Sequence, residues 1–220
     1  NFSAPDLVNP PESNISGSLV RPSDYIVSSR ALYLRFNNAY IAVGSESSPS
    51  SDNFAYTVPS IQEITFAVYA RASKTSGSSF IYSVFMKHDI VANSAGVSVP
   101  LYAAPSPSVP LNNSINVDTL TKFTWGQGAG DGVNLMRIFP ASGSYPSYYI
   151  FTTGTNEKIP NFSAQALGLP ANTAYKWMIN RYYPLTSVDD IASDTFRKLR
   201  EEWNKNYGYS YSEVFNFTSR

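Results

Sequence analysis

Few residues in this 220-residue chain are candidates for catalytic chemistry. The single histidine, His88, is followed directly by Asp89. Successive residues of a strand point to opposite faces, so these two side chains are poorly placed to act together as a general base and its orienting acid. We interpret His88 as a polar residue at the end of a strand. With one histidine, no cysteine and scattered carboxylates, the chain also lacks the usual ligands of a zinc site.

Two pairs of acidic residues are the remaining candidates for hydrolysis. Asp189–Asp190 and Glu201–Glu202 both fall in a segment with helical spacing. Glycoside hydrolysis needs two carboxylates that face one cleft, whereas adjacent residues of a helix point about 100° apart. We therefore expect these carboxylates on a solvated helix face, and we predict a protein that is not an enzyme and uses no cofactor. A hydrolase with an unrecognised site stays open as a third class of function.

A glycine-rich stretch, Gly126–Gly132, has some of the composition of a phosphate-binding loop. A dinucleotide-binding fingerprint needs glycines at fixed spacing and a helix after them. Here Asp131 takes one of those positions and a strand-like segment follows. We interpret the stretch as a flexible loop between two strands. A calcium-binding role for Asp131 stays open, although one carboxylate is fewer than that ion usually takes.

Aromatic residues are abundant, and 16 of them are tyrosines. Exposed tyrosine and tryptophan side chains anchor protein interfaces and stack on sugar rings. We predict a binding surface near the C-terminus, formed by Tyr182, Tyr183, Trp203, Tyr207, Tyr209 and Tyr211. The competing interpretation is internal, with the same rings capping the open end of a β-sandwich.

The candidate residues named above lie among short segments of alternating hydrophobicity, which must position them. Ala31–Phe36 and Ile64–Ala70 place apolar residues at every second position, which is typical of strands with one buried face. Similar segments recur along the chain and are separated by turn residues. This pattern predicts an all-β protein made of two tandem antiparallel, immunoglobulin-like β-sandwiches.

A proline-rich stretch divides the chain. Residues 104–110 contain three prolines, which exclude a helix and the interior of a sheet and predict an extended linker. We therefore expect an N-terminal tail at 1–13, one sandwich at 14–103 and a second at 111–220.

One segment departs from the strand pattern. Ser187–Asn204 carries apolar residues at helical spacing, and Ser187 is a suitable N-cap with two aspartates in the first turn. We predict a single amphipathic helix inserted before the final strand, Val214–Thr218, with its apolar stripe packed against the sandwich.

The second half of the chain contains residues at the spacing of a conserved turn motif that ends in a tyrosine. Trp125 lies in an early strand, and Leu169, Thr173 and Tyr175 follow the pattern Leu-x-Pro-x-Thr-x-Tyr, except that the proline comes one residue early. From Pro110 onward the chain resembles a fibronectin type III-like module. The resemblance implies that the Tyr175 ring packs in the core while its hydroxyl bonds to upstream backbone. It implies no activity, since such modules mostly bind or space.

The first half resembles a second family. Ile15–Leu19, and Tyr56–Pro59 leading into Ile64–Ala70, are similar to the opening strand and the late hairpin of transthyretin-like, carboxypeptidase-regulatory-like domains. Such domains are small sandwiches found in bacterial surface proteins and lipoproteins. The resemblance implies a seven-stranded sandwich with a role at the cell surface.

Charge and composition argue against some classes of binding partner. Lys and Arg total 16, and Asp and Glu also total 16, so bulk charge does not favour nucleic acid or an anionic membrane. No apolar stretch reaches about 18 residues, so no transmembrane segment is predicted. A chain without cysteine and rich in Ser, Thr and Tyr is typical of a bacterial exported protein, and we expect a signal or lipoprotein segment upstream of Asn1.

Taken together, these features predict a non-catalytic protein that is secreted, periplasmic or on the cell surface. Its expected role is adhesion or scaffolding, with an extracellular protein or a glycan as partner. The alternative is an accessory carbohydrate-binding module of a secreted enzyme system.

Overall fold

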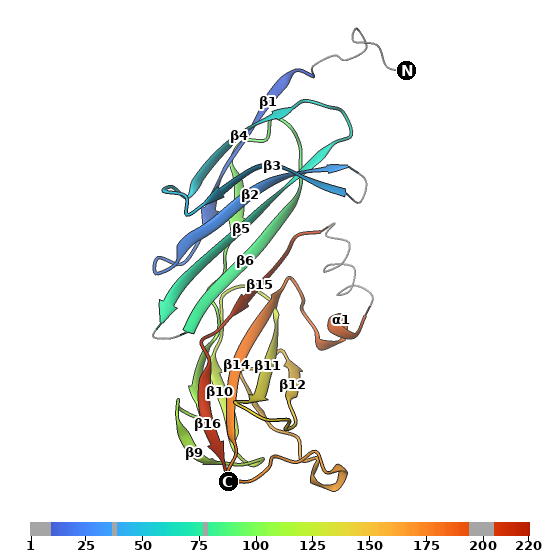
Figure 1. The fold of residues 1–220 in the computed structure, drawn as a ribbon. Helices are drawn as coiled ribbons and strands as arrows, with labels where there is room; N and C mark the ends of the chain where they lie inside the picture. The colour runs from blue at the N-terminus through green and yellow to red at the C-terminus, as the bar shows by residue number, and fades with distance from the viewer. Residues whose placement is uncertain (1–9, 37–38, 77–78, 194–204) are drawn as a thin grey trace.

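The computed structural model describes residues 10–36, 39–76, 79–193 and 205–220. Its regular structure is almost entirely β, which confirms the all-β prediction. Two three-stranded sheets cover the same side of one ten-stranded sheet that runs through both halves of the molecule (Figure 1). No helix within these ranges has the length and apolar composition needed to cross a membrane.

The first half is a sandwich of two sheets. The smaller sheet has the order β4-β1-β7, and the larger contributes β3-β2-β5-β6. Alternate residues of the facing strands, among them Ile15, Leu32 and Phe85, are buried between the sheets and form one core. The strands are β1 (Glu12–Val20), β2 (Ile26–Phe36), β3 (Ala39–Ser47), β4 (Asn53–Pro59), β5 (Thr65–Ser76), β6 (Ser79–Ile90) and β7 (Val97–Pro100).

The second half is built in the same way around a core of its own. A small sheet of order β13-β10-β8 faces β12-β11-β14, and Phe123, Ile138 and Trp177 are buried between them. The strands are β8 (Ser106–Val109), β9 (Ser114–Val117), β10 (Lys122–Gly126), β11 (Val133–Pro140), β12 (Tyr148–Thr152), β13 (Asn156–Lys158), β14 (Ala174–Tyr183), β15 (Tyr207–Tyr211) and β16 (Phe215–Ser219). A 3-10 turn, η2 (Ser163–Gln165), precedes β14.

Strand β15 joins the two halves into one sheet (Figure 1). It pairs on one side with β14 and on the other with β6, where Tyr209 lies opposite Val84. The two sandwiches are therefore connected by backbone hydrogen bonds as well as by the chain. The alternation within a strand does not specify which strand will pair with it, so the sequence does not predict this connection.

The glycine-rich stretch makes a second contact between the halves. Gly130, at a φ of +76°, lies against the ring of Tyr102. A Cβ on Gly128 would come within 2.7 Å of the Ala103 carbonyl oxygen, so this close approach requires glycine. Buried Arg181 donates a hydrogen bond to the Gly130 carbonyl at 2.7 Å. The stretch does lie between two strands, β10 and β11, as predicted. It is not a free loop, however, because it is packed and hydrogen-bonded where the two halves of the molecule meet.

Part of the predicted linker is a strand. Within residues 104–110, Ser106–Val109 forms β8 and pairs with β10. Pro107 is accommodated because β8 is an edge strand, where a missing N–H removes no interior ladder bond. The strand pairs are antiparallel, as predicted, except for β1 with β7 and β16 with β9, which are parallel.

The short helix begins where the sequence predicts. Helix α1 (Val188–Ala192) has Ser187 as its N-cap, and the Ser187 hydroxyl accepts a hydrogen bond from the Asp190 backbone N–H at 3.2 Å. The Asp190 carboxylate in turn accepts from the Ser187 backbone N–H at 2.9 Å, which completes a capping box. The helix ends at Ala192, short of the predicted end at Asn204. Residues 194–204 lie outside the described ranges.

The corner before β14 differs in one contact from what the family resemblance implies. The Tyr175 ring is buried and stacks on Phe217 with their centroids 5.6 Å apart. Its hydroxyl has no hydrogen-bond partner among the described residues. The corner is closed instead by Ser219, whose hydroxyl accepts from the Thr173 backbone N–H at 3.0 Å.

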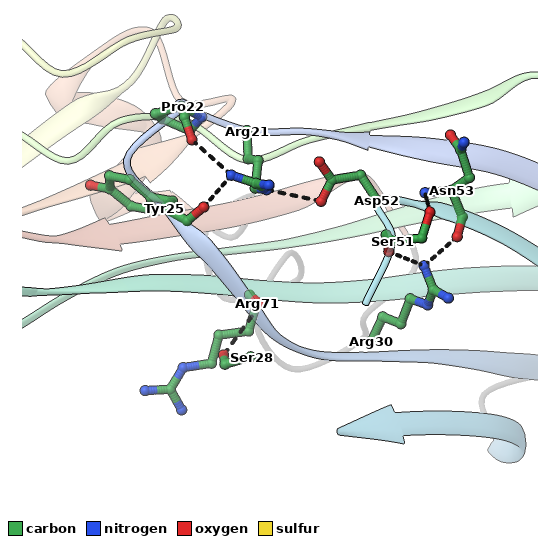
Figure 2. A network of polar contacts seen from close by, with 9 residues as sticks. All are labelled: Arg21, Pro22, Tyr25, Ser28, Arg30, Ser51, Asp52, Asn53 and Arg71. Atoms are coloured by element: carbon green, nitrogen blue, oxygen red, sulfur yellow. Dashed lines mark hydrogen bonds and ion pairs between the residues drawn. The ribbon is translucent and has the colours of Figure 1, made fainter. Parts of the chain in front are cut away.

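A polar network holds the loop before β4 onto the first sandwich (Figure 2). Arg30 is buried, and its guanidinium makes two contacts with the Glu46 carboxylate, at 2.7 and 2.9 Å. The same guanidinium donates to the carbonyls of Ser51 and Asn53, while Arg21 pairs with Asp52 at 2.8 Å. Arg21, Arg30, Glu46 and Asp52 are all paired within this network, so these four charged groups stabilise the loop.

The junction depends on a glycine in β15, and this can be tested. A Cβ on Gly208 would lie 2.5 Å from the Phe85 ring and 2.6 Å from the Val84 carbonyl oxygen, both in β6. We expect Gly208→Ala to push the strands apart and to lower the free energy of unfolding by about 1–3 kcal/mol, measured by urea denaturation.

Gly154→Ala is the matched control, because its Cβ would meet its nearest neighbour, the Thr152 hydroxyl, at an ordinary 3.4 Å. Its effect should stay within about 0.5 kcal/mol. Equal unfolding midpoints for Gly208→Ala and the wild type would show that the β15–β6 contact is not a tight one.

Candidate functional site

The side of the ten-stranded sheet that faces away from both cores is rich in tyrosine. We call it the tyrosine face. Register fixes its membership: Tyr209 lies opposite Val84 of β6 and Tyr182 of β14, and Val84 lies opposite Arg71 of β5. Directly paired residues point to the same side of a sheet. The tyrosines of this face are Tyr33, Tyr40, Tyr69, Tyr82, Tyr149, Tyr182, Tyr207, Tyr209 and Tyr211.

The centre of the tyrosine face is a cluster of rings that pack on one another. The rings of Tyr82 and Tyr211 are stacked with centroids 4.6 Å apart, and Tyr209 meets both of them edge-on. The Arg71 guanidinium lies 4.5 Å from the centroid of Tyr82. Because these rings cover one another, they present mainly edges and hydroxyl groups to solvent.

The hydroxyl groups of this cluster stay protonated at neutral pH. Partial burial raises the pKa of Tyr82, of Tyr209 and of Tyr211 above that of a free tyrosine. A protonated phenol donates and accepts hydrogen bonds but is a poor nucleophile. The chemistry that the cluster offers is therefore recognition through hydrogen bonds and apolar contact.

The structure separates the predicted binding residues into three groups. Tyr182, Tyr207, Tyr209 and Tyr211 lie together on the tyrosine face and are half-buried. Tyr183 lies on the opposite side, 1% exposed, with its hydroxyl 2.9 Å from that of Ser210 and its ring against Tyr102. It is removed from the predicted surface, because neighbouring residues of a strand alternate between faces. Trp203 lies outside the described residues.

Sequence analysis missed the contribution of the first half. Tyr69, Arg71 and Tyr82 belong to the tyrosine face, although they precede the C-terminal tyrosines by more than a hundred residues in the chain. The alternation of Tyr69 and Arg71 with buried alanines was a signal that they share one face. Only the pairing of β15 with β6 shows that this is the same face as that of Tyr209.

The segment that follows β14 and includes α1 covers one end of the tyrosine face. Leu185 and Ile191 pack against Val133, Phe151 and Tyr207. This end of the face is therefore an interior contact. The remainder, around Arg71, Tyr82 and Tyr149, is not part of that cluster.

A small hollow opens at the other end of the tyrosine face. Tyr33, Tyr40, Tyr69 and Met86 line about 280 Å³, which suits one ring or one side chain rather than a large ligand. His88 is buried beside it, with Nδ1 3.4 Å from the Tyr40 hydroxyl. Burial lowers the pKa of His88 to about 4, so the ring is neutral at pH 7.

The other candidates for chemistry have structural partners. Asp190 is held in the capping box of α1, and Arg181 donates to the Gly130 carbonyl and to the Asn134 side chain. Asp131 is exposed in the loop beside them. Across the described ranges, no group of three or more His, Asp or Glu side chains is placed to hold a metal ion. Glu201 and Glu202 lie outside those ranges.

No family model matches the chain, and no curated protein matches it either. What this surface can bind is therefore inferred from the geometry and charge of its own residues.

The neutral His88 predicts a pH dependence of stability. Its pKa is about 4 in the folded chain and near 6.5 when unfolded, so the unfolded chain takes up a proton first as pH falls. The stabilisation is complete above pH 7 and is lost as pH falls from about 6.5 towards 4. Between pH 7 and pH 5 we expect a loss of about 2 kcal/mol in the free energy of unfolding, measured by urea denaturation.

His88→Gln is the control, since glutamine does not titrate and His88 is the only histidine. Its unfolding free energy should change much less between the same two pH values. An equal loss in both proteins would assign the effect to carboxylates elsewhere.

Proposed function

We propose that this chain is a non-catalytic binding module of an exported bacterial protein, at the cell surface or in the periplasm, and that it acts in adhesion or as a scaffold. The single observation that carries the proposal is the tyrosine face, which draws side chains from both halves onto one rigid sheet. Tyrosine and arginine are the side chains that most often anchor interfaces, because each offers a large contact area with a polar end.

The architecture suits binding better than catalysis. The rings are fixed by their neighbours, so little conformational entropy remains to be lost when a partner binds. Their phenols are kept neutral by burial, and the one histidine lies buried beside the hollow with a lowered pKa. These features support a preorganised surface that recognises a partner without changing it.

An accessory carbohydrate-binding module is the second candidate. The specific observation in its favour is the hollow beside Tyr69, because the Tyr69 ring does not take part in the stacked cluster around Tyr82. An open aromatic ring in a small hollow is a suitable seat for one sugar ring.

Adhesion through the tyrosine face can be measured with coated beads. Beads carrying the wild-type chain, applied to cultured epithelial cells and to bacterial cells, should be retained on at least one of these surfaces. The double variant Tyr149→Ala/Tyr209→Ala removes the exposed ring beside Arg137 and one ring of the central cluster, and we expect it to reduce retention about tenfold.

Tyr145→Ala is the matched control, because Tyr145 is an exposed tyrosine in a loop outside the tyrosine face. Its retention should equal that of the wild type. Retention of the double variant at the wild-type level, with both proteins folded by circular dichroism, would exclude this face as the adhesive surface.

A further inference from the structure

Each half of the molecule places an arginine on the tyrosine face, lying over aromatic rings. In the first half, the Arg71 guanidinium lies 4.5 Å from the Tyr82 centroid. In the second half, the Arg137 guanidinium lies 5.7 Å from the centroids of both Phe139 and Tyr149. In both arginines Nε is buried and has no hydrogen-bond partner among the described residues. The aromatic rings hold each guanidinium in place without neutralising it.

The charge of these arginines is not balanced within the described ranges. The ion pairs there join other residues, and neither Arg71 nor Arg137 takes part in one. Lys176 adds a third cation, because it lies opposite Phe139 on the same face and is in none of those pairs. Asp89, an acid near this face, is paired with Arg35 at 3.4 Å. Arg71, Arg137 and Lys176 therefore place three cations on this face, and none of them is in an ion pair within the described ranges.

The two arginines stand at opposite ends of a row that crosses the junction. The row runs from Arg71 on β5 to Tyr82 on β6, and then to Tyr211 on β15, which lies opposite Tyr82. It next crosses β14 and ends at Arg137 on β11. Arg71 is in register with Val133 of β11, four strands away, and Arg137 lies four residues further along β11. Strand spacing and rise per residue together separate the two arginines by about 23 Å. Because β6, β15 and β14 belong to one sheet, this spacing is fixed.

We infer that the tyrosine face binds an acidic polysaccharide, laid across the strands with carboxylate or sulfate groups on Arg71 and Arg137 and sugar hydroxyls on the tyrosines between them. This inference rests on the proposed adhesive function and names the chemical class of its ligand. Guanidinium groups match carboxylate and sulfate oxygens in a two-point geometry. A stiff polymer with regularly repeated charges suits two cationic positions held at a constant distance.

An acidic peptide fits the same charges less well. Extended peptides gain affinity mainly by adding a strand to an open sheet edge. The row crosses β6, β15 and β14, each of which is already paired on both sides. A polypeptide lying there could not add a strand to the sheet, whereas a polysaccharide has hydroxyl groups that the tyrosines can bind individually.

The test uses alginate and heparin as acidic probes and dextran as a neutral one, with binding followed by isothermal titration calorimetry on the full chain. We expect alginate or heparin to bind and dextran to bind at least about tenfold more weakly. Raising NaCl from about 0.05 M to about 0.5 M should weaken binding of the acidic probe, because salt screens exposed charges. Arg71→Gln/Arg137→Gln should reduce affinity for it by about tenfold or more.

Lys122→Gln/Lys158→Gln is the matched control. It removes the same charge from exposed residues of β10 and β13, in the small sheet away from the tyrosine face, and should change affinity less than about twofold. Equal losses in the two double variants would overturn the inference, since bulk charge alone would then explain binding. Equal affinity of the arginine variant and the wild type would also overturn it.

Two further probes separate the ligand classes. Polyglutamate, or vesicles containing anionic phosphatidylglycerol, should bind more weakly than the acidic polysaccharide, and tighter binding of either one would replace it as the ligand class. If Tyr149→Ala/Tyr209→Ala abolishes bead retention while alginate and heparin fail to bind, the adhesive function stands and the acidic polysaccharide is wrong. Normal retention of that tyrosine variant would instead remove the adhesive function.

Discussion

The pairing of β15 with β6 is the constraint on which the rest of the molecule depends. Through it, residues Tyr207–Tyr211 continue a sheet that begins in the first half and ends at β12 in the second. Backbone hydrogen bonds fix the register, and a glycine at 208 permits the close approach. The contact of Tyr102 with Tyr183 lies on the other side of the same junction. Two sandwiches that would otherwise be free to rotate therefore present their outer faces on the same side of one continuous sheet.

Both small sheets cover the same side of the long sheet, and among the described residues the opposite side is covered only at one end, by the segment that includes Leu185 and Ile191. An open face of a sheet must shield its backbone and still meet water. Tyrosine does both, since its ring covers the strand while its hydroxyl stays hydrated. The stacked rings of Tyr82 and Tyr211 and the guanidinium of Arg71 are the result at the junction. The proposed binding function rests on this same surface.

Buried polar side chains mark where the fold is closed rather than where chemistry occurs. Arg30 fixes the loop before β4 through Glu46 and two carbonyls, and Arg181 fixes the glycine-rich stretch through a carbonyl and an amide. Each arginine replaces water with several oxygen partners, which offsets part of the cost of burying its charge. His88 avoids that cost by remaining neutral. Arg71 and Arg137 lie instead over rings of the tyrosine face, and neither takes part in an ion pair among the described residues.

The sequence by itself determined the class of fold, most strands and the start of the helix, because these depend on local rules. Alternation in Ala31–Phe36 places one face inward wherever the strand lies, and Ser187 with Asp190 caps a helix within four residues. Only the tertiary structure decided that Tyr183 is buried, that Tyr82 stands beside Tyr211, and that one sheet spans both halves. The reason is physical: a strand's side-chain pattern fixes which residues share a face, but hydrogen bonds between backbones are the same for every sequence. The choice of neighbour is therefore made by the packing of the whole chain.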